Sequence, residues 1–303
     1  MTTDVRPARA GRSFAAVLVA VVAGTAACGT AATPDRPGPE VMVSAPPLAY
    51  LAERVAGADA DVTSLVPPGG DPHSQEISPA TLAEMASADL VVYVSGLQPA
   101  VDEAAALVAP SHAVDVLDAA TAAVADGGEP PDPGRDPHFW LDPVRFGLAA
   151  GLVADALAEV DPDREARYRT RAQALVDDLE HLDEAYREAL APCAGAVLVT
   201  SHEAFGYLAA RYDLEQQGLT GVDPAVEPSP ARLREVRDLV LRTGVRTIFF
   251  ETAAAPGLAH RLADDLGVGT AVLDPMERTQ DLDYLATMRT NLDALAEGLV
   301  CEG

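Results

Sequence analysis

Short runs of β-branched and large apolar residues alternate along most of this chain with longer segments whose apolar residues recur at helical spacing. The runs that predict strands are residues 41–44, 62–66, 90–95, 113–116, 196–200, 247–250 and 269–273. The segments that predict helices are residues 48–56, 79–87, 203–211, 230–243, 258–266 and 281–299. Strands that alternate with helices are typical of βαβ units, so the pattern predicts an α/β protein in two halves, each with a parallel sheet flanked by helices.

A longer helical segment separates the two halves. Asp161 before Pro162 is a good start signal, with Asp as the N-cap and Pro at the first helical position, and the segment ends before Pro192. Its apolar residues fall on one face at spacings of four, three and four: Leu175, Leu179, Leu182 and Tyr186. Residues 161–191 therefore predict a helix of roughly 45 Å. We expect it to join a first lobe, residues 41–160, to a second lobe, residues 192–303.

The start of the chain has the pattern of an export signal. Three Arg residues precede an apolar run over residues 14–23, which is too short to span a bilayer because a span needs roughly 20 residues. The run ends in Thr25-Ala26-Ala27-Cys28, similar to a bacterial lipobox with Cys28 as the lipidated first mature residue. We expect a signal peptide over residues 1–27 and a Pro-rich, lipid-anchored tether over residues 28–40. An ordinary cleaved signal with an incidental cysteine is the alternative.

Two cysteines remain after Cys28, and export gives them an oxidising compartment. A disulfide between Cys193 and Cys301 would close a loop of 108 residues (301 − 193), worth at most about 4.7 kcal/mol on the chain-entropy model. We favour this pairing; two unpaired, partly buried thiols are the alternative.

The composition excludes one class of partner. The 303 residues include 47 acidic residues (Asp and Glu) and 21 basic residues, and every basic residue is Arg. The net charge is −26. Nucleic-acid binding needs clustered cations, so we expect no nucleic-acid partner. With 49% hydrophobic residues, the bulk of the chain has enough apolar surface to fold.

Several candidate metal ligands follow predicted strands. His73 lies in the loop after residues 62–66, His202 directly follows residues 196–200, and Asp274 directly follows residues 269–273. Ligands of parallel α/β proteins bind beyond the carboxyl ends of the strands, so these side chains are placed for binding.

The fourth candidate is His138, because the tripeptide Asp-Pro-His occurs twice, at residues 71–73 and 136–138. Proline stiffens its own backbone and that of the residue before it, so each His stands on a rigid stub. Asp71 and Asp136 are hypothesised to orient the imidazoles.

Three imidazoles and one carboxylate suit Zn²⁺, although the four residues lie far apart in sequence and no compact metal spacing links them. The other histidines, His112, His181 and His260, are interpreted as surface or packing residues. Signatures of other chemistry are missing from the sequence. His202-Glu203 does not begin an HExxH motif, since Gly206 stands at the second His position, and there is no Gly-x-Ser-x-Gly elbow.

Several motifs in order resemble those of the cluster A-I metal-binding proteins of bacterial ABC transporters, and the zinc-type branch is the most similar. The similar segments are residues 65–73 (LVPPGGDPH), 88–93 (ADLVVY), 136–143 (DPHFWLDP), 201–207 (SHEAFGY), 248–251 (IFFE) and 272–276 (VLDPM). Together they extend over nearly the whole chain after the leader.

The resemblance implies a two-lobed α/β fold joined by a long backbone helix, with the metal in the cleft between the lobes. It places the four ligands on His73, His138, His202 and Asp274. Manganese-type members typically have Glu at the third position, so His202 favours zinc. Zinc-type members often carry a His-rich acidic loop between the first two ligands, whereas residues 119–137 are acidic without His.

The resulting prediction is an extracytoplasmic protein that binds Zn²⁺ with high affinity and delivers it to the permease of an ABC importer. We expect a monomer on the outer face of the cytoplasmic membrane or in the periplasm. Four protein ligands leave no position for a reactive water, so we expect no enzyme. The alternatives are a secreted zinc hydrolase with Asp274 or Glu251 as general base, and a manganese-type protein, adhesin or periplasmic chaperone on the same scaffold.

Overall fold

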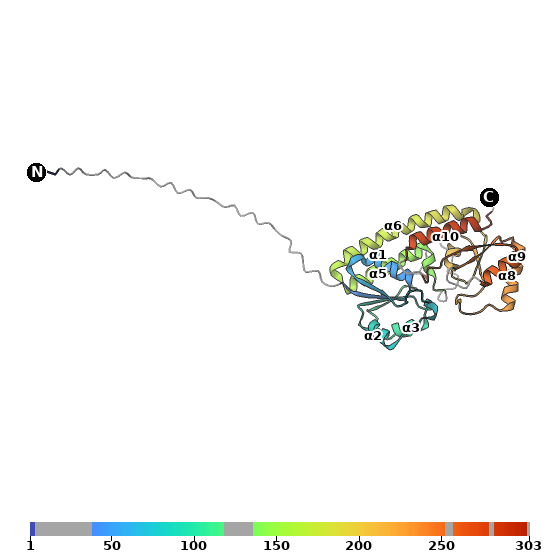
Figure 1. Cartoon of the computed structure of the whole chain (residues 1–303), viewed down its shortest axis with the longest axis horizontal. Coiled ribbons are helices and arrows are strands. Elements are labelled where there is room, and N and C mark those ends of the chain that lie inside the picture. The colour runs from blue at the N-terminus through green and yellow to red at the C-terminus, as the bar shows by residue number, and fades with distance from the viewer. Residues whose placement is uncertain (4–37, 118–135, 252–256, 279–281, 302–303) are drawn as a thin grey trace. The chain divides into compact units, whose positions relative to one another are not determined.

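The computed structural model describes residues 1–3, 38–117, 136–251, 257–278 and 282–301 (Figure 1). Residues Pro37–Gly303 form one compact unit, separate from Met1–Arg36. The predicted signal peptide beyond residue 3, Cys28, and the tether up to residue 37 lie outside the described residues. Among the residues described, no helix combines the length and the apolar character that crossing a bilayer requires.

The first half is a four-stranded parallel sheet in the order β2-β1-β3-β4. Its strands are β1 (Glu40–Val43), β2 (Asp61–Ser64), β3 (Leu90–Tyr93) and β4 (Ala113–Asp115). Its helices are α1 (Pro46–Ala56), α2 (Pro79–Ser87) and α3 (Pro99–Ala105), with short 3₁₀ turns η1 (Gly57–Asp59), η2 (Pro72–Ser74) and η3 (Phe139–Leu141).

The second half repeats this topology with the order β6-β5-β7-β8, again all parallel. Its strands are β5 (Val197–Thr200), β6 (Glu215–Gly218), β7 (Thr247–Phe250) and β8 (Gly269–Val272). Its helices are α7 (Gly206–Arg211), α8 (Pro230–Thr243), α9 (Gly257–Leu266) and α10 (Tyr284–Gly298). The predicted fold class, two parallel sheets flanked by helices with one long helix, is confirmed.

Among the α-helices and strands of the described residues, the hydrophobic pattern does not predict α3, α5 (Pro143–Val160) and β6. The sequence of β6, Glu-Gln-Gln-Gly, contains no β-branched or aromatic residue. It is a strand because its backbone pairs with that of β5, a tertiary interaction that overrides local propensity. The helix predicted over residues 203–211 begins at Gly206 instead, and residues 201–203 form a bend.

The long helix α6 (Glu165–Leu190) has 26 residues, about 39 Å in length, and follows the 3₁₀ turn η4 (Pro162–Arg164). The side chain of Asp161 does not cap it, because its carboxylate accepts hydrogen bonds from Arg164 Nη1 at 2.6 Å and from the Tyr168 hydroxyl at 2.7 Å. The face predicted to be apolar is buried, and α6 packs along α1, α5 and α10 (Figure 1).

Ion pairs on buried acidic residues hold α6 near both of its ends. At the start, Asp59 of η1 forms ion pairs with Arg164, Arg167 and Arg171. Toward the end, Asp183 accepts from the guanidinium of Arg211 on α7. The helix is therefore fastened to both halves.

One apolar cluster runs through both halves and contains the large side chains of Trp140, Phe146, Tyr186, Phe249 and Tyr284. The opposite face of each sheet has its own smaller cluster, beneath α2 and α3 in the first half and beneath α8 and α9 in the second. The predicted disulfide between Cys193 and Cys301 is present, and it joins the turn η5 (Ala191–Cys193) to the segment after α10.

Candidate metal centre

His73 lies on η2, in the loop that follows β2. Asp71 is the N-cap of this turn, and its Oδ1 accepts a hydrogen bond from the backbone N–H of His73 at 3.0 Å. Pro72 occupies the first position of the turn, so Asp71 and Pro72 together restrict the backbone at His73. The hypothesised role of Asp71 is thereby revised: the carboxylate contacts the backbone of His73.

His138 is fully buried and precedes η3. Asp136 Oδ1 accepts from the backbone N–H of His138 at 3.0 Å and lies 2.8 Å from its ring Nδ1. Here the hypothesised carboxylate does orient the imidazole. With Nδ1–H donating to Asp136, Nε2 is the nitrogen of this ring that can bind a metal once it is deprotonated.

His202 follows β5 directly, as the pattern of strand ends predicts. Its side chain is 1% exposed, and its Nδ1 forms a hydrogen bond with Glu251, the residue after β7. The Ser201 hydroxyl donates to the same Glu251 oxygen at 2.6 Å. The Nε2 atom of His202 is buried, and none of the described residues forms a hydrogen bond with it.

The fourth member of the cluster is Glu277. Its Oε1 lies 3.1 Å from His73 Nε2, 2.7 Å from His138 Nε2 and 3.8 Å from His202 Nε2. One ligand atom from each of the four residues lies within 4.8 Å of all the others. The cluster joins the two halves, since His73 and His138 precede α6, whereas His202 and Glu277 follow it.

Asp274, the predicted carboxylate ligand, is not part of this cluster. Its Oδ1 accepts a hydrogen bond from the backbone N–H of Met276 at 2.7 Å, and its backbone is bound on both sides by the amide of Asn291. Met276 is buried in a left-handed conformation with φ of 65°, a geometry rare for a side chain of this kind. The turn built by Asp274 carries the chain three residues further and brings Glu277 to the histidines.

The sequence reasoning took the residue nearest the strand end, whereas the structure brings Glu277 to the histidines. A sequence signal for the turn exists: an Asp before Pro tends to form a turn with the backbone two residues on. Further contacts fix this turn against the first half, since Trp140 Nε1 donates to the Pro275 carbonyl at 2.8 Å.

The donor atoms fit a tetrahedral zinc ion. With bonds of about 2.0–2.1 Å, such an ion separates its ligand atoms by roughly 3.4 Å. The three contacts to Glu277 Oε1, at 2.7–3.8 Å, bracket that value. The unpartnered Nε2 of His202 adds an acceptor that the protein itself does not satisfy. Three nitrogens and one oxygen also match zinc better than manganese, which prefers more oxygen ligands.

The electrostatics of the cluster favour a cation. Burial raises the pKa of Glu277, but the nearby imidazoles of His138, His202 and His73 outweigh it and hold that pKa well below the ordinary range. Burial lowers the pKa of His202, while the Glu251 and Glu277 carboxylates raise it to a net value of about 10. The pKa of His138 is likewise raised by Asp136 and Glu277 against the effect of burial. Without metal, protons on His138 and His202 therefore balance the negative charge of the neighbouring carboxylates.

The remaining histidines lie apart from the cluster, as interpreted from the sequence. His112 and His181 are exposed. His260 on α9 is half-buried, with its ring centroid 4.5 Å from that of Phe250.

The chain matches, over residues 41–298, the family ZnuA, described as "Zinc-uptake complex component A periplasmic". The high-affinity zinc uptake system protein ZnuA of Bacillus subtilis is 30% identical over 307 residues, which cover 94% of this chain and 96% of that protein. The zinc-binding lipoprotein AdcA of Streptococcus pneumoniae is 31% identical over 85% of this chain. The chain spans only 55% of the length of AdcA.

Solved structures show the same fold. The Zn(II)-bound ZnuA-like domain of Streptococcus pneumoniae AdcA superposes with a TM-score of 0.72 at 30% identity and covers 88% of this chain and all of that one. The laminin-binding protein Lmb of Streptococcus agalactiae, described as a bifunctional adhesin with metal-transporting activity, gives a TM-score of 0.75 at 32% identity over 86% of this chain and 99% of that one.

Proposed function

Because the chain belongs to the ZnuA family of periplasmic zinc-uptake components, we propose that it captures Zn²⁺ outside the cytoplasm and hands it to the permease of an ABC importer. The observation that carries the proposal is the convergence of three imidazole Nε2 atoms on one buried carboxylate oxygen. His73, His138, His202 and Glu277 are the proposed ligands.

Zinc is the cargo, and the residues of the site prepare its binding. Asp136 and Glu251 accept from the Nδ1 atoms of His138 and His202, which fixes the tautomer that leaves each Nε2 free to bind metal. Together with Glu277, the three carboxylates place three negative charges on or beside a dication. Zinc and the protons on the imidazoles compete for the same Nε2 atoms, so binding is coupled to proton release.

The geometry favours binding over hydrolysis. Four protein ligands complete the coordination of zinc and leave no open position for a water nucleophile. Both residues considered as a general base are engaged elsewhere: Glu251 accepts from Ser201 and His202, and Asp274 accepts from the Met276 backbone. The donor set of three nitrogens and one oxygen likewise favours zinc over manganese as cargo.

The proposal extends to the location of the protein. Residues 1–27 would direct export, and Cys28 would carry the lipid that holds the domain through residues 28–40 at the outer face of the membrane. In cells that express the full chain, Cys28→Ala should move the protein from the membrane fraction to the soluble exported fraction. A variant that stays with the membrane would show that Cys28 is not the anchor.

The test of the proposed function is a chelator-competition titration of purified residues 29–303 with Zn²⁺ and Mn²⁺, with bound metal counted by elemental analysis. We expect one tightly held zinc per chain and much weaker manganese. Absence of tight zinc would refute the proposal. The transport step is tested separately, by asking whether deletion of the gene abolishes growth in zinc-depleted medium and whether added zinc restores it.

A further inference from the structure

We propose that the ion pair between Asp71 and Arg278 ties the two halves together beside the metal centre and sets how long a bound zinc ion stays. The inference rests on the proposed function, and it assigns positioning roles to two residues that do not bind the metal themselves. Two observations support the inference: the imidazoles of the site are not all fixed by a second hydrogen bond, and the ion pair lies beside two of the ligands.

The three histidines are not held equally. The rings of His138 and His202 are 0% and 1% exposed, and each is fixed at Nδ1 by a buried carboxylate. The ring of His73 is 7% exposed, and among the described residues no hydrogen bond reaches its Nδ1. His73 is therefore the least constrained imidazole of the site.

His73 is instead positioned through its backbone, by Asp71. Its Oδ1 accepts from the His73 backbone N–H at 3.0 Å, and its Oδ2 accepts from Arg278 Nη2. Arg278 is the residue after Glu277, whose carboxylate meets His73 Nε2 at 3.1 Å. The turn that carries the first ligand and the turn that carries the fourth are thus joined twice, once through the ligands and once through the ion pair.

The ion pair is the more exposed of these two connections. The side chains of Asp71 and Arg278 are 22% and 35% exposed, against 7% and 4% for His73 and Glu277. Water and salt reach the pair while the ligands remain shielded. When the pair separates, η2 is joined to the other half only through His73 itself, and His73 becomes the first ligand free to leave.

The experiment measures zinc release from the purified protein by stopped-flow mixing with excess chelator, at concentrations where the rate no longer depends on the chelator. Asp71→Asn keeps an N-cap side chain but removes the charge, and Arg278→Gln removes the partner charge. We expect each to speed release about fivefold, the effect of losing one partly exposed ion pair. The double variant should release no faster than either single variant, because both changes remove the same interaction.

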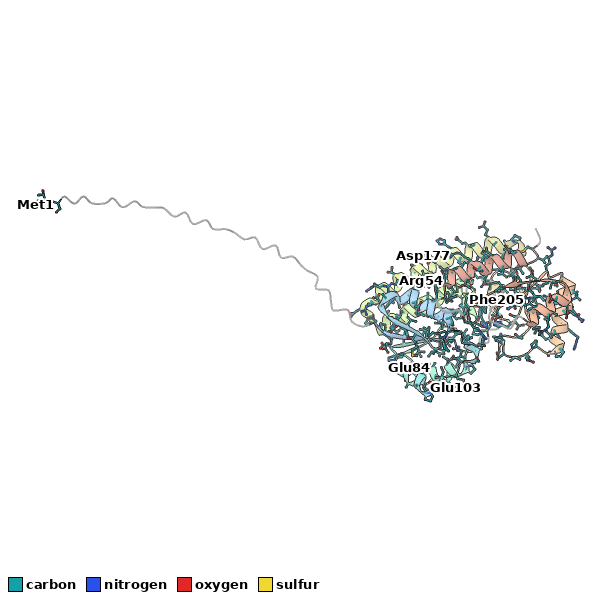
Figure 2. All side chains as sticks on the ribbon, in the orientation of Figure 1. Met1, Arg54, Glu84, Glu103, Asp177 and Phe205 are labelled. Atoms are coloured by element: carbon teal, nitrogen blue, oxygen red, sulfur yellow. A yellow bond between two sulfur atoms is a disulfide. The ribbon has the colours of Figure 1, made fainter. Side chains whose placement is uncertain are left out.

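The matched control is Arg54→Gln. Arg54 of α1 pairs with Asp178 of α6 at 2.8 Å, and the two side chains are 34% and 46% exposed. Figure 2 labels Arg54 beside Asp177, the neighbour of Asp178. This pair has similar exposure but lies away from the ligands, so its loss should leave zinc release unchanged. Thermal melts of the metal-free variants report whether each one folds.

The wild-type protein provides a second test that needs no variant. Raising the ionic strength from about 0.05 M to 0.5 M screens a partly exposed pair, so wild-type release should accelerate about threefold. Release from Arg278→Gln should not respond to salt.

The outcomes separate this inference from the proposed function. A wild-type protein without tight zinc refutes the function, and the inference falls with it. Tight zinc with release from both single variants at the wild-type rate overturns the inference alone. So does an additive double variant of about 25-fold, since additivity means that the two residues act separately, and so does a wild-type release rate that is independent of salt.

Discussion

The identity of the carboxylate ligand is the sharpest test of the site, because the sequence indicates Asp274 and the structure places Glu277 at the histidines. The discriminating pair of variants is Glu277→Gln and Asp274→Asn. Each replacement keeps the size and a hydrogen-bonding oxygen while it removes the negative charge, so a difference between them reports the role of the charge.

The expected loss for Glu277→Gln follows from its burial. The carboxylate is 4% exposed and faces three imidazoles, so its removal leaves a buried dication among neutral ligands. Breaking a buried charge pair costs about 3–5 kcal/mol, or roughly 10²- to 10⁴-fold in Kd. A water molecule that takes over the ligand position would move the result toward the lower limit.

Asp274→Asn should have a small effect by comparison. The side-chain oxygen of Asn accepts the same hydrogen bond that Met276 N–H now gives to Asp274 at 2.7 Å, so the turn that positions Glu277 is retained. A weakened hydrogen bond costs about 1 kcal/mol at most, which limits the change in Kd to roughly fivefold.

Competition against a chromophoric chelator measures both affinities, and elemental analysis confirms the number of zinc ions. A larger loss for Asp274→Asn than for Glu277→Gln would refute the assignment of Glu277 and restore the one made from the sequence. Equal losses of zinc affinity would mean that the charge of Asp274 matters as much as that of Glu277, which contradicts a purely structural role for Asp274.

Four further outcomes are expected. Alanine at any one of the three site histidines should weaken zinc binding at least about 100-fold, whereas His181→Ala and His260→Ala should not; equal effects in the same titration would contradict the ligand set. Zinc affinity should fall with decreasing pH, because the pKa of His138 and of His202 is raised and zinc must displace protons from these imidazoles; calorimetry in buffers of different ionisation enthalpy should record proton release on zinc binding at pH 7, and no release would be inconsistent. Reduction of Cys193–Cys301 should lower the unfolding temperature but keep one zinc per chain, since the bridge closes a 108-residue loop worth at most about 4.7 kcal/mol; an unchanged melt would refute this. Asp183→Asn should lower the unfolding temperature at pH 7 by roughly 5–15 °C, because buried Arg211 loses one of its two carboxylate partners. The pKa of Asp183 is lowered by Arg211 despite the opposing effect of burial, so its contribution is present above the unfolded pKa of 3.8 and the deficit should shrink as the pH falls below that value.

The fold was largely predictable because its signals are local. The buried strands β1, β3, β5 and β7 are short apolar runs, and the buried face of α6 repeats at helical spacing. β6 was not predictable, since its four polar or glycine residues carry no strand pattern and its pairing with β5 is a tertiary effect.

The structure brings together the three histidines named from the sequence, but the carboxylate beside them is Glu277 and not Asp274. His202 lies two residues after the end of β5, so the strand brings it to the edge of the sheet. Glu277 reaches the cluster only through a turn that contains a left-handed Met276, a conformation that sequence patterns do not reveal. Glu251 contacts His202 from a distant part of the chain, and no sequence pattern indicates this contact. Asp136 contacts His138 from within the same Asp-Pro-His turn, which is visible in the sequence.

The fastening of α6 at both ends has a consequence for how the loaded protein is recognised. Asp59 forms ion pairs with three Arg side chains in or just before the first turns of α6, and Asp183 near the end of α6 forms an ion pair with Arg211. Bending the helix would break these buried or partly buried ion pairs. Large rotation of one half against the other is therefore costly, whereas the short turns that carry His73 and Glu277 are free of that constraint. A receptor that distinguishes the full from the empty state then has to recognise small rearrangements of these loops on an otherwise constant surface. Its discrimination then depends on contacts with those turns, and the bulk of the molecule serves as a fixed docking frame.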